Sequence, residues 1–119
     1  MWGNVTEGDV RYASPEMVEQ KNLGLEHDIW SLGVLAYFLF AGHFPFEGES
    51  EAEINKKILE SEPDWEVLKA RSIDASVVEV IRGMLVKNVS KRWSLEDITR
   101  SEAFSHLEDI ESQVQDAVN

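Results

Sequence analysis

The chain has 119 residues, enough for one domain, and 43% of them are apolar, including four Trp and five Phe, which excludes a wholly disordered protein. It has no Cys, which excludes a disulfide framework, Cys-ligated zinc and a thiol nucleophile and favours an intracellular, cytoplasmic protein. The formal net charge of −12 argues against binding to nucleic acid or to an anionic membrane surface.

The first predicted helix follows a loop over residues 1–13. Ser14 is suited to the N-cap, Pro15 to the first helical position and Glu16 to the first turn. Gly24 and the residues before it end this helix after about two turns. A stronger helix is predicted over residues 26–41, where apolar residues occupy every side of the helical wheel, a pattern typical of a buried helix. This apolar run is shorter than the roughly 20 residues that span a bilayer, and no signal peptide is visible.

The remaining sequence is also helical in character. Gly42 begins a turn-rich loop, Ser50 begins a helix that is broken at Pro63, Asp74 caps the next helix and Ser94 opens another. A last amphipathic stretch lies within residues 107–118. No run alternates with a period of two residues, so no strand is predicted. The expected fold class is all-α, with about five or six helices around a central helix at residues 26–41.

Four motifs occur in an order that points to one family. They are Tyr12-Ala13-Ser14-Pro15-Glu16, Asp28-Ile29-Trp30-Ser31-Leu32-Gly33, Gly42-His43-Phe44-Pro45-Phe46 and the segment from Met84 to Ser94, which contains Arg92. Together they resemble the C-terminal half of the large lobe (C-lobe) of a eukaryotic protein kinase, most closely the calcium/calmodulin-dependent group of Ser/Thr kinases. The first motif is similar to A-P-E, with Ser14 in place of Ala, and the second to the D-x-W-S-x-G signature of that lobe.

The resemblance implies a parent protein that transfers the γ-phosphoryl group of Mg-ATP to a protein Ser or Thr. It divides the chain into the end of an activation segment (residues 1–13), helical C-lobe (14–106) and an acidic amphipathic tail (107–119). The sequence contains no Gly-rich phosphate loop, no H-R-D motif and no D-F-G motif. We therefore expect no catalytic, cofactor-binding or metal-binding residue in this chain, and no activity or Mg-ATP binding by the chain alone.

Three residues carry structural roles that the resemblance implies. Glu16 and Arg92 correspond to a buried ion pair that ties the activation segment to the late helices, in which Arg matches the carboxylate with two hydrogen bonds. Asp28 corresponds to a residue that supports the catalytic loop in the parent. Without the family, Glu16 is a first-turn acid, Arg92 an unrelated surface residue and Asp28 an acid favoured by the helix dipole.

The substrate-facing loop is expected at Gly8, Asp9, Val10, Arg11 and Tyr12. The family usually has G-T-x-x-Y here, with a Thr that binds the catalytic Asp and Lys, whereas this chain has Asp9. A second carboxylate beside the catalytic Asp would disturb the site, so a pseudokinase scaffold is an alternative for the parent. Thr6 is the one Ser or Thr in residues 1–13 and is a candidate phosphorylation site, with an ordinary loop Thr as the alternative.

The expected partners are a protein substrate or regulatory protein and the remainder of the kinase domain. Residues 101–119 contain five acidic residues and no Lys or Arg, so they do not form a calmodulin target, which is basic; they are a helix that packs back on the lobe or a spacer. The central helix cannot be covered on every side by the predicted short helices, so self-association through it is expected. A non-catalytic, acidic helical interaction module remains the alternative from another class.

Overall fold

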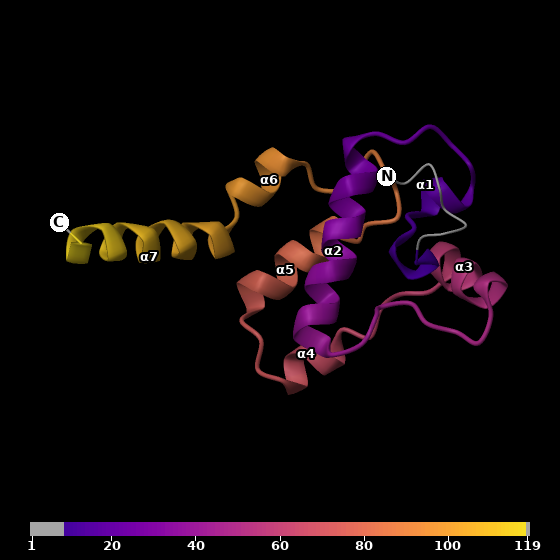
Figure 1. Ribbon diagram of the computed structural model, residues 1–119, viewed down its shortest axis with the longest axis horizontal. Coiled ribbons are helices and arrows are strands. Elements are labelled where there is room, and N and C mark those ends of the chain that lie inside the picture. The colour runs from indigo at the N-terminus through magenta and orange to yellow at the C-terminus, as the bar shows by residue number, and fades with distance from the viewer. Residues whose placement is uncertain (1–8, 119) are drawn as a thin grey trace.

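The computed structural model describes residues 9–118, apart from the side chains of residues 106–110. These residues form one 3-10 helix and seven α-helices and contain no β-strand (Figure 1). In chain order the elements are η1 (Val10–Tyr12), α1 (Pro15–Val18), α2 (Leu25–Ala41), α3 (Glu51–Glu60), α4 (Glu66–Ala70), α5 (Ala75–Met84), α6 (Leu95–Thr99) and α7 (Glu102–Val118). The all-α prediction is confirmed, but the predicted number of helices is too low.

The additional helices are short. Helix η1 has three residues and α4 has five, so neither is long enough to show a helical repeat of apolar residues. Helix α1 has four residues rather than the predicted two turns, because the chain turns at Gln20, which has a φ of 59°. Asp74 and Ser94 cap α5 and α6 as predicted, and Ser94 forms a capping box with Asp97.

Helix α2 crosses α5 at close range in the centre of the molecule (Figure 1). A β-carbon at Gly33 of α2 would lie 2.8 Å from the β-carbon of Met84 in α5, so only Gly allows this approach. A β-carbon at Gly83 would lie 2.2 Å from the ring of Trp93, which packs against α5 at this glycine. Gly33 therefore sets the distance between α2 and α5, and Gly83 sets the distance between α5 and the segment that follows it.

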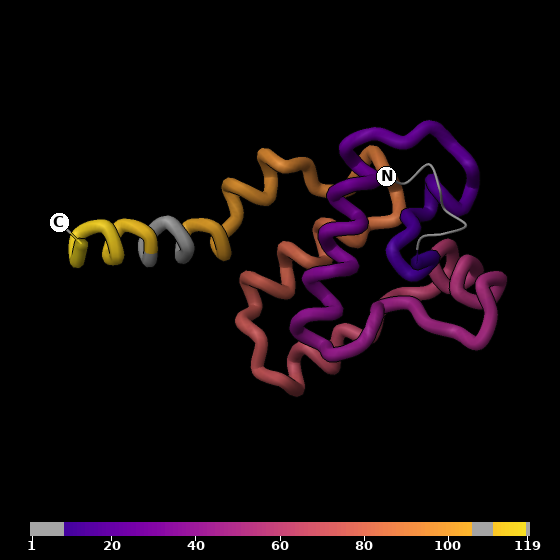
Figure 2. Tube along the Cα trace, viewed as in Figure 1, coloured from indigo at the N-terminus to yellow at the C-terminus, as the bar shows by residue number. Residues whose placement is uncertain are grey.

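Two groups of elements flank α2. The chain trace in Figure 2 shows residues 9–24 beside α3 on one side of the molecule and α6 with α7 on the other, in agreement with the contacts of η1 and α1 with α3. Helix α7 packs against α5 and α6 near its start, and its later turns project away from the body. The tail from residue 111 to residue 118 is exposed, which agrees with a spacer rather than with a helix packed along the lobe.

The prediction of a buried central helix is correct for one face of α2. Trp30, Val34 and Tyr37 are fully buried in the core. The opposite face keeps Leu32, Leu35 and Leu39 exposed, by 48%, 40% and 69% respectively. No helix within residues 9–118 is both long enough and apolar enough to cross a membrane.

Candidate functional site

A buried ion pair joins α1 to the segment between α5 and α6. The Nη1 and Nη2 atoms of Arg92 lie 2.6 and 2.9 Å from the two carboxylate oxygens of Glu16, and the two side chains are 0% and 6% exposed. Ser14 caps α1 and so places Glu16 in its first turn, pointing into the protein. The structure thus brings together two residues that are 76 positions apart in the sequence.

The Arg92 side chain has a partner for each of its five N–H donors. Besides Glu16, Nε donates to the carbonyl of Val86 (2.8 Å), Nη1 to that of Glu26 (2.7 Å) and Nη2 to that of Lys87 (3.3 Å). Lys has three donors without the planar arrangement, so it could not replace Arg here. Arg92 therefore ties together α1, the first turn of α2 and the turn after α5.

A second buried pair lies behind Glu16. The Oγ of Ser14 accepts a hydrogen bond from the Met17 amide at 3.2 Å and lies 2.8 Å from Nδ1 of His27, which is 2% exposed. Burial lowers the pKa of His27, and attraction to Glu16 and Asp28 offsets only part of that effect. Burial alone would raise the pKa of Glu16, but the hydrogen bonds and charge of Arg92 hold it below its ordinary value. At neutral pH the site therefore contains an ionised Glu16 carboxylate and a neutral His27 imidazole.

The predicted substrate-facing loop carries its own Arg–carboxylate pair. Asp9 is the N-cap of η1 and accepts a hydrogen bond from the Arg11 amide at 2.9 Å. The guanidinium of Arg11 also binds Asp9 through Nε and Nη2, at 2.9 and 2.7 Å, and this side-chain hydrogen bonding lowers the pKa of Asp9. The Asp9 carboxylate is thus ionised and turned onto its own loop.

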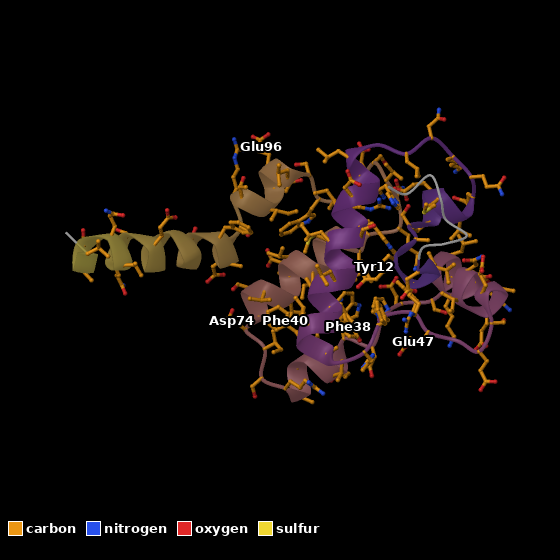
Figure 3. The ribbon with its side chains drawn as sticks, viewed as in Figure 1. Tyr12, Phe38, Phe40, Glu47, Asp74 and Glu96 are labelled. Carbon is orange, nitrogen blue, oxygen red and sulfur yellow. The ribbon has the colours of Figure 1, made fainter. Side chains whose placement is uncertain are left out.

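Arg11 also fastens this loop to the loop after α2. Its Nη1 donates to Glu47 at 3.1 Å, and its guanidinium carbon lies 3.8 Å from the centre of the Phe44 ring. Tyr12 packs edge-on against the same ring, 5.2 Å away, and Phe38 packs on it at 4.6 Å. Figure 3 shows Tyr12, Phe38 and Glu47 in this part of the molecule. Arg11 and Phe44 therefore hold residues 9–12 against α2 and the loop that begins at Gly42.

The sequence matches the family model described as "protein kinase domain" over residues 3–104. The chain belongs to the protein kinase domain family. It is 37% identical over 109 residues to calcium-dependent protein kinase 29 of Arabidopsis thaliana, covering 92% of this chain and 19% of that protein. It is 34% identical over 100 residues to calcium/calmodulin-dependent protein kinase type 1B of Rattus norvegicus, covering 84% of this chain and 28% of that kinase.

A solved structure has the same arrangement of helices. The structure of a twitchin kinase fragment from C. elegans, described as having autoregulated protein kinase and immunoglobulin domains, matches with a TM-score of 0.71 and 26% sequence identity. The match covers 78% of this chain and 21% of that one. The chain spans less than a third of the length of each of these relatives. Family membership and the helical C-lobe architecture are therefore established for these residues.

The other predicted site residues are not brought into this cluster. Asp28 lies exposed in the first turn of α2, and it accepts no hydrogen bond from the residues that the structure describes. Gly8 and Thr6 lie outside the described residues. Val10 belongs to η1 and packs against the core.

The residues present do not fit Mg-ATP. Within the described part of the chain, no group of three His, Asp or Glu side chains could hold a metal ion. The kinase motifs that bind phosphate and Mg²⁺ are absent from the sequence.

Sequence reasoning missed two features of the site. His27 precedes a kinase motif but lies on an apolar helix, where nothing in the sequence distinguishes it from an exposed residue. The contacts of Arg11 with Glu47 and Phe44 join residues more than 30 positions apart without any shared repeat. A signal was present only in the Asp-x-Arg spacing of Asp9 and Arg11, which suits a short Asp cap.

Proposed function

We propose that the chain forms the substrate-side part of the C-lobe of a Ser/Thr protein kinase, whose complete domain transfers the γ-phosphoryl group of ATP to a protein hydroxyl inside the cell. The observation that carries this proposal is the Glu16–Arg92 pair, whose two charges are buried and whose guanidinium donors all have partners. Burial of two charges costs free energy, which is recovered only when Glu16 and Arg92 meet, so the pair favours one position of α1 and of the loop before it.

In this proposal the chain positions the protein substrate. Catalysis of phosphoryl transfer depends mainly on positioning and on charge stabilisation, and Mg-ATP supplies the transferred group. Arg92 fixes α1, and Arg11 fixes residues 9–12 against Phe44, so the loop offers a defined surface to a substrate segment. The phosphate-binding residues belong to the rest of the kinase domain.

The test is phosphate transfer by the full-length protein that contains this chain. We expect it to incorporate phosphate from labelled ATP into a mixture of protein substrates, and we expect Arg92→Lys to lower the rate at least tenfold. Arg100→Lys is the matched control, because Arg100 pairs with Glu96 on the surface and its side chain is 77% exposed. The 119-residue chain alone should show no calorimetric binding of Mg-ATP at concentrations up to about 1 mM.

A pseudokinase scaffold is the second candidate, favoured by Asp9. The family has Thr at this position, and the resemblance gives that Thr a role in binding the catalytic Asp and Lys. Asp9 cannot donate a hydrogen bond when ionised, and Arg11 already occupies both of its oxygens. A full-length protein that binds partner proteins but transfers no phosphate would favour the scaffold over the enzyme.

The exposed face of α2 is proposed to be covered by the rest of the kinase domain. Leu32, Leu35 and Leu39 are 40% or more exposed, and each large apolar side chain left uncovered forfeits about 1.5–3 kcal/mol. The isolated chain should therefore self-associate through this face. Sedimentation at micromolar concentration should show dimers or larger species, and Leu35→Lys should shift them toward monomer. A monomeric wild-type chain would contradict this expectation.

A further inference from the structure

An apolar groove lies where α7 leaves the body of the protein. It has a volume of about 410 Å³ and is lined by side chains of α2, α5 and α7, among them Phe40, Val77, Met84 and Phe104. This volume lies within the range of ligand-binding pockets, about 300–1,000 Å³. Asp74 is the one charged residue of its lining in the described part of the chain, and Figure 3 shows Asp74 close to Phe40.

Helix α7 extends this apolar surface outward. Val114 and Val118 are 56% and 76% exposed, and at a rise of about 1.5 Å per residue they lie about 15 and 21 Å beyond Phe104 along the helix. In the sequence, apolar residues of α7 are separated by four, three, four and three positions, which is the heptad spacing of a helix that packs on another helix. They are Ala103, Leu107, Ile110, Val114 and Ala117.

The charge of α7 has a single sign. Residues 101–119 contain five acidic residues and no Lys or Arg. Arg100, the nearest preceding cation in the sequence, is paired with Glu96 at 2.6 Å. A second copy of α7 would place acidic helices side by side, which is unfavourable. The charge therefore favours a partner with basic residues beside an apolar stripe.

We propose that the groove and α7 together form a docking site for a basic amphipathic helix of a partner protein. The apolar stripe of the partner packs along Val114 and Val118, and one large apolar side chain at its end enters the groove between Phe40 and Phe104. Its Lys or Arg residues face Asp74 and Glu111, which speeds association and excludes acidic helices. A partner helix of about four to five turns matches the distance from Phe104 to Val118.

The test measures binding of a fluorescent 18-residue peptide of Leu and Lys, with Leu at heptad positions, to the whole 119-residue chain by anisotropy. We expect a micromolar Kd for wild type and at least tenfold weaker binding for Val114→Asp, which changes an exposed side chain and leaves the core intact. Leu59→Asp is the matched control, because Leu59 of α3 is also exposed and the variant gains the same charge. It should bind the peptide within twofold of wild type.

Three results would overturn the proposal. The first is that Val114→Asp and Leu59→Asp bind the peptide equally well. The second is that a peptide with Glu in place of Lys binds as tightly as the basic peptide, and the third is that the wild-type chain does not bind the basic peptide. A second variant, Phe104→Ala, probes the groove separately and should weaken binding at least fivefold. This proposal does not depend on kinase activity, because the assay contains neither ATP nor a substrate.

Discussion

Two Arg–carboxylate pairs hold opposite ends of the same segment, and they differ mainly in burial. Arg92 and Glu16 have side chains that are 0% and 6% exposed, whereas those of Arg11 and Asp9 are 34% and 35% exposed. Both pairs have two short hydrogen bonds between guanidinium and carboxylate. Their chemistry is therefore the same, and their surroundings differ.

Burial decides what each pair contributes. Removal of one partner from a buried pair leaves a charge without water or a counter-ion, whereas an exposed charge returns to solvent at little cost. Loss of one partner should therefore cost more stability in the buried pair that anchors α1 than in the exposed pair at residues 9–12.

The largest expected effect comes from Arg92→Ala. It strands the Glu16 carboxylate in the core and leaves the carbonyls of Val86 and Glu26 without their donor, so we expect the free energy of unfolding to fall by roughly 3–5 kcal/mol. Urea denaturation followed by circular dichroism measures this. If the chain does not fold at all, Glu16→Gln, which keeps the side-chain volume, should show a smaller loss of the same sign. A loss below about 1 kcal/mol for both would mean that the pair is not an anchor.

The segment that carries Arg92 is itself held by packing on α5. Gly83→Ala places a methyl group against the Trp93 ring, and we expect a loss of roughly 2–3 kcal/mol although Ala is normally the better helix residue. Gly48→Ala is the control, since the nearest atoms there belong to the surface side chain of Glu53. Thermal melts of both variants provide the comparison. A neutral or stabilising Gly83→Ala would show that the Trp93 ring moves aside freely.

The two buried titratable groups, His27 and Glu16, predict that the free energy of unfolding depends on pH. The folded pKa of His27 is lowered by burial, so folding is favoured by its neutral form and this contribution is lost as the pH falls below about 6.5, its ordinary value. The pKa of Glu16 is lowered too, so its contribution disappears only below about 4.3. Stability should decline in two steps between pH 7.5 and pH 3. His27→Asn should remove the first step while His43→Asn keeps it; a first step present in both variants would contradict the assignment.

The sequence predicts the long helices well because burial leaves a periodic or continuous apolar signal. Residues 26–41 and the capped helix after Asp74 are examples. It fails for η1 and α4, which are too short for a period, and it underestimates α7, which begins at Glu102 and so five residues before the predicted stretch. The conformation of such short elements depends on contacts with residues far away in the sequence, which a short stretch of sequence does not reveal.

The candidate site is predicted from the sequence only in part. The pairing of Glu16 with Arg92 is predicted from the order of the family motifs, because no periodicity connects residues so far apart. The network of Arg11 with Glu47 and Phe44 joins residues more than 30 positions apart, and no local sequence pattern indicates it. The exposed face of α2 could be anticipated by counting apolar residues against the few helices available to cover them.

A small effect on stability is expected for Arg11→Ala. The pair with Asp9 is exposed by about a third and the stacking on Phe44 is at the surface, so the free energy of unfolding should fall by about 1 kcal/mol or less. The same urea experiment as for Arg92→Ala gives the comparison. High salt should reduce this difference, because exposed charges are screened. A loss as large as that of Arg92→Ala would remove the distinction between the two pairs.

The smallest effect on stability, and the most informative for function, belongs to Asp9→Thr. A Thr hydroxyl can still accept the hydrogen bond of an N-cap, and the lost ion pair is exposed, so the free energy of unfolding should change by less than about 0.5 kcal/mol. In the full-length protein, removal of the carboxylate and restoration of the family hydroxyl should raise the rate of phosphate transfer. Asp9→Asn removes the charge but adds no hydroxyl, so it separates the effect of the lost charge from that of the restored hydroxyl. An unchanged or lower rate for Asp9→Thr would mean that the loop, held by Arg11 as it stands, already suits the proposed reaction and that Asp9 does not impair it.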